Sequence, residues 1–257
     1  MVRVATKNSE DVSALAIGGS GRLAWFDVTS TQIDISQEFY LNLFGWKSEP
    51  IEIAEAPGYL VMRSGNQIMA GVDPIDKSKG PAVWTIFVST TDLRATAQSI
   101  ETHGGAMTIP PAQVLNLGRM AMARDPEGTV FGLWEPQEYS PADIPIVEGK
   151  LVGARLATVD PESASRFYVE AFGWDSRDED DGSVTMQCGG MVAHVQKDLQ
   201  ANVWTPTVAV ADVRTSCRRV AELGGSVLTG EAEDEPLVAD PLGALFRLRT
   251  VAMVGGT

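Results

Sequence analysis

An aromatic pattern occurs twice in the chain, half a chain apart, and it constrains the fold more than any other feature. The pattern reads Phe-Tyr-x-x-x-Phe-Gly-Trp and occupies residues 39–46 and 167–174 of a 257-residue chain. Self-similarity at a fixed separation is the signature of a duplicated structural unit. The sequence therefore predicts two copies of one domain.

Other segments repeat in the same order and support the duplication. Val-Trp-Thr occurs at 83–85 and 203–205, and Asp-Pro-x-Gly occurs at 125–128 and 240–243. The separation falls along the chain, so the second copy has the shorter loops. We expect a leader over residues 1–21, a first domain over 22–137, a linker over 138–149 and a second domain over 150–251.

Each copy is predicted to contain two successive modules. Each module consists of one strand, one helix and three further strands. Apolar residues at helical spacing predict helices over 33–44, 92–103, 161–172 and 214–223, and a glycine follows each of them. Turn residues separate the short apolar runs that predict strands. The predicted strands cover residues 22–28, 51–54, 59–63, 67–72, 82–89, 107–109, 119–123, 130–134, 150–158, 183–195 (two strands), 202–210 and 245–250.

Composition limits the kinds of partner that the chain is expected to bind. The formal net charge is −14, which disfavours nucleic acid and anionic membranes and leaves either a cationic small molecule or simple solubility as its role. The two cysteines fit no metal or disulfide framework, and no signal peptide or 18-residue apolar run is present. We expect a cytoplasmic protein, monomeric or homodimeric, with a small-molecule partner.

Four β-α-β-β-β modules, the aromatic helix and the Asp-Pro-x-Gly turn together resemble the vicinal oxygen chelate superfamily. That superfamily includes glyoxalase I, extradiol dioxygenases and bleomycin-resistance-type binding proteins. The resemblance covers about residues 22–250. It implies an α+β fold of tandem domains, in which curled mixed sheets enclose clefts. It also implies a divalent metal in enzymes of the family, held by His or Glu on the first and last strands of each module.

The residues at those positions argue against a metal. By strand register the resemblance assigns eight positions, of which one holds a plausible ligand, His194. Three protein ligands are the usual minimum for a catalytic ion. The other histidine, His103, ends a helix, where its charge suits the dipole. We therefore expect no metal, cofactor or catalytic residue of the usual kind. The eight positions are Leu23, Gly71, Thr85, Gly132, Gly153, His194, Thr205 and Arg247.

Strand alternation predicts what lines the cleft of the first domain instead. Aromatic side chains and methionines would surround one carboxylate, which suits a flat aromatic ligand with or without an amine. The same side chains could equally fill the cleft as core. The residues expected to face the cleft are Leu23, Trp25, Asp27, Thr85, Phe87, Val130, Gly132 and Trp134, with Met69, Met120 and Met122 nearby.

The second cleft is predicted to be polar and cationic. It could bind an anion, pair with acidic residues of the other domain, or stay partly solvated. The acidic run at 178–181 is read as a solvated loop. The residues expected on this face are Arg155, His194, Thr205, Thr207, Arg247 and Arg249.

These observations favour a metal-independent binding protein for an aromatic antibiotic or biosynthetic intermediate, acting in sequestration or as a biosynthetic accessory. The predicted ligand-binding residues are Trp25, Asp27, Thr85, Phe87, Met120, Trp134, His194, Thr205 and Arg247. Two enzymatic alternatives stay open. One is a metal-dependent glyoxalase, isomerase, epimerase or dioxygenase. The other is metal-independent acid–base catalysis by Asp27 or His194.

Overall fold

A computed structural model describes residues 20–53, 56–138, 148–198, 202–230 and 233–251. Most of the expected leader, and linker residues 139–147, lie outside this part. None of the helices in the described ranges is long and apolar enough to cross a bilayer.

Local sequence explains where three of the main helices begin and where two of them end. Asp92, Asp160 and Asp212 each accept a hydrogen bond from the backbone N–H three residues later, which caps an N-terminus. Gly45 and Gly173 end their helices in the left-handed conformation, with φ of 72° and 70°. The helices are α1 (Ile33–Phe44), α2 (Leu93–Thr102), α3 (Pro161–Phe172) and α4 (Val213–Glu222), with a short 3-10 helix at Lys77–Lys79.

Eight strands of the first domain form one curled sheet. Its two modules join through an antiparallel pair, β1 with β5, and the spatial order is β2-β3-β4-β1-β5-β8-β7-β6. The strands are β1 (Leu23–Ser30), β2 (Lys47–Pro50), β3 (Leu60–Ser64), β4 (Gln67–Pro74), β5 (Trp84–Ser89), β6 (Ala106–Val114), β7 (Gly118–Arg124) and β8 (Val130–Pro136).

The second domain repeats this sheet, in the order β10-β11-β12-β9-β13-β16-β15-β14. Its modules join through β9 and β13, again antiparallel. The two domains and the α+β architecture are as predicted. The strands are β9 (Leu151–Thr158), β10 (Asp175–Asp178), β11 (Val184–Cys188), β12 (Met191–Lys197), β13 (Val203–Val210), β14 (Ser226–Val227), β15 (Leu237–Ala239) and β16 (Leu245–Thr250).

Polar edge strands are where the sequence prediction was wrong. The second strand ends at Pro50, before the predicted run at 51–54, and β10 was not predicted; it ends at Asp178, where the predicted acidic loop begins. All four residues of β10 are exposed, so no apolar alternation marks it. The short strands β14 and β15 were not predicted either.

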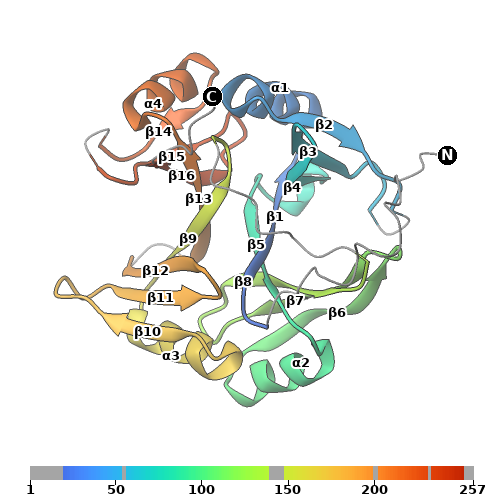
Figure 1. The fold of residues 1–257 in the computed structure, drawn as a ribbon, viewed down its shortest axis with the longest axis vertical. Helices are drawn as coiled ribbons and strands as arrows, with labels where there is room; N and C mark the ends of the chain where they lie inside the picture. Colours follow the sequence, from blue (N-terminus) through green and yellow to red (C-terminus); the bar gives the residue numbers. More distant parts are fainter. Residues whose placement is uncertain (1–19, 54–55, 139–147, 199–201, 231–232, 252–257) are drawn as a thin grey trace.

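The two sheets share one hydrophobic core, and the repeated aromatic motif lies within it. Figure 1 shows α1 beside α4 and α2 beside α3, with β5 and β13 near the centre, where they pack together. Phe39 and Tyr40 on α1 meet Phe246 of the second domain, each with ring centroids 6.2 Å apart. The motif therefore also joins the two domains.

Two reciprocal hydrogen bonds cross between the domains. The Tyr40 hydroxyl donates to Asp240 Oδ2 (3.1 Å) and accepts from Trp84 Nε1 (3.1 Å). The Tyr168 hydroxyl donates to Asp125 Oδ2 (3.2 Å) and accepts from Trp204 Nε1 (2.9 Å). Each aspartate begins an Asp-Pro-x-Gly turn, so the helix of each domain binds the turn of the other.

Candidate functional site

The concave face of the first domain collects the predicted aromatic residues. Across β1 and β5, Trp25 lies opposite Phe87 and Asp27 opposite Thr85. Met120 on β7 lies opposite Trp134 on β8. Directly opposed residues point to the same side of a sheet. The register thus places all six predicted domain 1 residues on four adjacent strands.

Leu23 does not belong to this face, contrary to the prediction. A register shift separates Leu23 from Trp25, and Leu23 pairs with Val88 instead. Both side chains are nearly inaccessible and belong to the hydrophobic core. An extra residue in a strand inverts the alternation beyond it, and nothing in the sequence marks this one.

Asp27 forms the polar centre of the face. Its Oδ1 accepts hydrogen bonds from Tyr59 Oη and from Trp25 Nε1, both at 2.5 Å. Burial raises the pKa of Asp27 from 3.8 to about 6, although the hydrogen bonds from Tyr59 and Trp25 oppose the shift. The carboxyl group therefore titrates near neutral pH. The sequence reasoning missed Tyr59, which immediately precedes β3.

Two strand glycines, Gly71 and Gly132, allow neighbouring side chains to pack directly over the backbone. A Cβ on Gly71 would lie 1.8 Å from Tyr59 Oη and 2.1 Å from Asp27 Oδ1. A Cβ on Gly132 would lie 2.1 Å from the Phe87 ring. A glycine within a strand often marks such a close approach, and this signal was available in the sequence.

The residues at the family's metal positions do not fit a metal ion. Gly71 and Gly132 have no ligand atoms, and Tyr59, Asp27 and Phe87 fill the space beside them. In the second domain Arg247 would bring a positive charge to a divalent ion. Within the described ranges, no three His, Cys, Asp or Glu side chains are grouped so that they could hold a metal.

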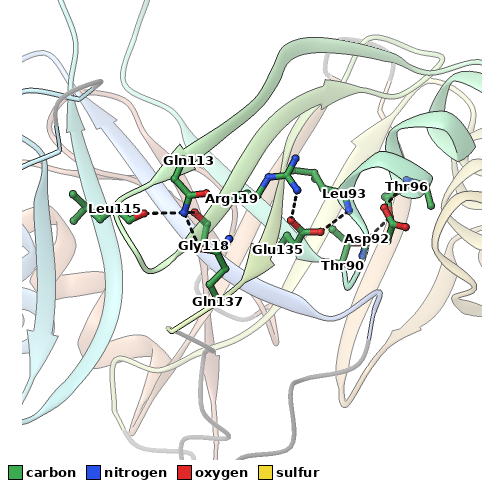
Figure 2. A network of polar contacts seen from close by, with 11 residues as sticks. Thr90, Asp92, Leu93, Thr96, Gln113, Leu115, Gly118, Arg119, Glu135 and Gln137 are labelled. Atoms are coloured by element: carbon green, nitrogen blue, oxygen red, sulfur yellow. Dashed lines mark hydrogen bonds and ion pairs between the residues drawn. The ribbon is translucent and has the colours of Figure 1, made fainter. Parts of the chain in front are cut away.

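A polar network fixes the β7–β8 side of the face, and Figure 2 shows it. Glu135, next to Trp134, accepts from Arg119 Nη1 (2.9 Å) and from the Leu93 backbone N–H at the start of α2 (3.0 Å). Gln113 donates to the carbonyl oxygens of Leu115 and Gly118 in the neighbouring hairpin. The strands carrying Met120 and Trp134 are thereby tied to one helix and one turn.

The concave face of the second domain is charged, but it carries carboxylates as well as the predicted cationic side chains. Arg155 lies beside His194 and opposite Thr205, and Arg247 lies beside Thr207. Thr205 and Arg247 are buried, with 4% and 6% of their surface exposed, whereas His194 is half-buried. Burial lowers the pKa of His194.

The cations of this face pair with a residue of their own domain. Arg155 Nη2 lies 2.9 Å from Glu235 Oε2, and Arg249 contacts Oε1 of the same carboxylate. Burial opposes ionisation of Glu235, but Arg249 and Arg155 outweigh it and lower its pKa. Sequence reasoning missed Glu235 because it lies in a polar loop before β15.

Tandem domains of paired β-α-β-β-β modules, with concave sheet faces, define the vicinal oxygen chelate class of fold. Residues 12–133 match the family described as "Glyoxalase/Bleomycin resistance protein/Dioxygenase superfamily", and residues 154–249 match "Glyoxalase-like domain". The chain belongs to this superfamily.

Relatives and solved structures agree with that assignment. The anthracycline biosynthesis protein DauV of Streptomyces sp. (strain C5) is 31% identical, covering 88% of this chain and 92% of its own. The Mn(II)-bound glyoxalase from Novosphingobium aromaticivorans superposes with a TM-score of 0.66 at 11% identity, covering 90% of this chain and 82% of its own. The 2,3-dioxygenase LapB from Pseudomonas sp. KL28 superposes with a TM-score of 0.65 at 13% identity, covering 92% of this chain and 94% of its own. At these identities the two structures show the fold alone.

Proposed function

We propose that the chain binds a flat aromatic small molecule on the concave face of its first domain, as an accessory or sequestering protein of antibiotic biosynthesis. The observation that carries the proposal is the replacement of the metal positions by glycines, over which aromatic side chains lie. The name of DauV, an anthracycline biosynthesis protein, supports the choice of ligand class.

The chemistry of the face suits such a ligand. Trp25, Met120 and Thr85 are half-buried and offer contact surface, while Phe87 and Trp134 on the same face are buried. Indole rings stack on flat aromatic molecules, and methionine adapts to irregular shapes. Asp27 is ionised above about pH 6 and is then able to pair with an amine on the ligand.

Titration with doxorubicin tests the proposal, because this anthracycline carries both a planar ring system and an amine. Calorimetry at pH 7.5 should show saturable binding, accompanied by quenching of tryptophan fluorescence. Trp25→Leu should weaken binding about tenfold through loss of one stacking surface and its packing. Leu115→Ala, which shortens an exposed side chain on the β6–β7 turn, is the matched control and should bind normally.

A second ligand separates the role of the rings from that of Asp27. Asp27→Asn should weaken doxorubicin but leave 1,4-dihydroxyanthraquinone, which has no amine, nearly unaffected. Absence of calorimetric binding and of any thermal shift with both compounds would contradict the proposal.

A second candidate function is metal-independent acid–base catalysis at the same place. It is favoured by one observation, the hydrogen bond between Tyr59 and a carboxyl group whose pKa is near 6. Turnover of a bound aromatic compound that Asp27→Asn abolishes while binding persists would support catalysis over binding alone.

A further inference from the structure

The second domain contains a cavity that the aromatic site does not explain. Its volume is about 930 Å³, and its walls come from strands β9 to β12, from Arg249 on β16 and from the loop that carries Glu235. Arg155, Arg249, His194 and Glu235 are among its lining residues. We propose that this cavity is a second ligand site, which binds a small organic monocarboxylate against Arg155 and Arg249.

Positive charge is in excess at the inner end of the cavity. Arg155 and Arg249 both contact the Glu235 carboxylate, and Arg247 donates through Nη1 to the Glu235 backbone oxygen (2.8 Å). Among the described residues, two guanidinium groups thus share the Glu235 carboxylate, and a third, from Arg247, lies against the backbone of the same residue. Because these partly buried cations outnumber the carboxylate that they share, a second carboxylate would be stabilised here.

Buried groups behind this cluster add to its positive charge. The Nε–H groups of Arg155 and Arg247 are buried and have no hydrogen-bond partner within the described part of the chain. Because they are inaccessible, they contribute uncompensated positive charge and are not a contact for the ligand. Burial, and repulsion by Arg155, also lower the pKa of Arg247 to about 10.

The rim of the cavity has the opposite charge and limits the ligand class. Asp180, Asp181 and Asp234 are exposed carboxylates on its lining, and Arg177 is already paired with Glu179 at 2.8 Å. These carboxylates repel a ligand with several negative charges and attract an ammonium group. A monocarboxylate with a neutral or cationic far end fits both regions, whereas a phosphate ester does not.

Saturation-transfer NMR with three small compounds tests the proposal. We expect 4-(aminomethyl)benzoate and benzoate to bind, and phenyl phosphate to fail. Arg249→Met should weaken the two carboxylates about tenfold. Arg166→Met, on the exposed face of α3, is the matched control and should have no effect.

Glu235→Gln distinguishes a ligand site from a purely structural ion cluster. Removal of the internal carboxylate leaves the guanidinium groups less compensated, so benzoate should bind about tenfold more tightly. If the cluster only anchors its loop, this variant gains no affinity. Unchanged or weaker binding in folded Glu235→Gln, or tighter binding of phenyl phosphate than of benzoate, would overturn the proposal.

The test remains decisive if Arg249→Met fails to fold, because Glu235→Gln is expected to strengthen benzoate binding. Loss of folding cannot produce such a gain. It is also independent of the aromatic site in the first domain. Trp25→Leu should leave benzoate binding unchanged, so failure at one site says nothing against the other.

Discussion

Replacement of Asp27 by Asn should change how the stability of the protein depends on pH. The pKa of Asp27 is raised in the folded chain from 3.8 to about 6, chiefly by burial. A carboxyl group with a raised folded pKa favours the folded state while it is protonated. Its stabilising contribution is fully present below about pH 4 and is lost as pH rises through about 6.

The size of the effect follows from the shift. Each unit of pKa corresponds to about 1.4 kcal/mol, so a rise from 3.8 to about 6 corresponds to roughly 3 kcal/mol. The free energy of unfolding of the wild type, minus that of Asp27→Asn, should therefore fall by about 2–3 kcal/mol between roughly pH 4 and pH 8. Other titrating groups largely cancel in this difference.

Urea denaturation followed by circular dichroism, at closely spaced pH values, measures that difference. Asp178→Asn, on the exposed strand β10, controls for the removal of one negative charge. A difference between wild type and Asp27→Asn that stays constant from about pH 4 to pH 8 would refute the assignment of a buried carboxyl with a raised pKa.

Three further predictions concern the core, the aromatic face and the metal positions. Tyr40→Phe should lower the free energy of unfolding by about 1–3 kcal/mol in urea melts, because it leaves the buried Trp84 N–H without its acceptor. Gly132→Ala should lower it by about 1–3 kcal/mol and weaken doxorubicin, since its Cβ would overlap the Phe87 ring. Elemental analysis of protein purified without chelators should find Mn, Fe, Ni and Zn well below one equivalent per chain. A near-stoichiometric metal would contradict the inference that Gly71 and Gly132 occupy the family's metal-ligand positions.

Helices and central strands were predictable because local chemistry specifies them. The bounds of α1 and α3 match the prediction, since apolar spacing and a following glycine mark each helix. Edge strands such as β10 were not predictable, because all its side chains are exposed and only pairing with β11 makes it a strand.

The candidate site was predictable where strands alternate regularly. Trp25, Phe87 and Trp134 share a face as expected, because β1, β5 and β8 lie side by side in the sheet. Tyr59 and Glu235 were missed because each reaches its partner from a distant segment. Long-range contacts of this kind depend on the path of loops, which residue types alone do not specify.

The reciprocal Tyr–Asp bonds between the domains have a consequence for how far the two concave faces can differ. The helix tyrosine of each half bonds to the turn aspartate of the other half. This reciprocal arrangement is the geometry of an isologous dimer. In a dimer of identical chains, every mutation appears in both clefts at once. Fusion of the halves into one polypeptide keeps the interface but removes that constraint. In one polypeptide, the first concave face can therefore carry aromatic residues while the second carries charge.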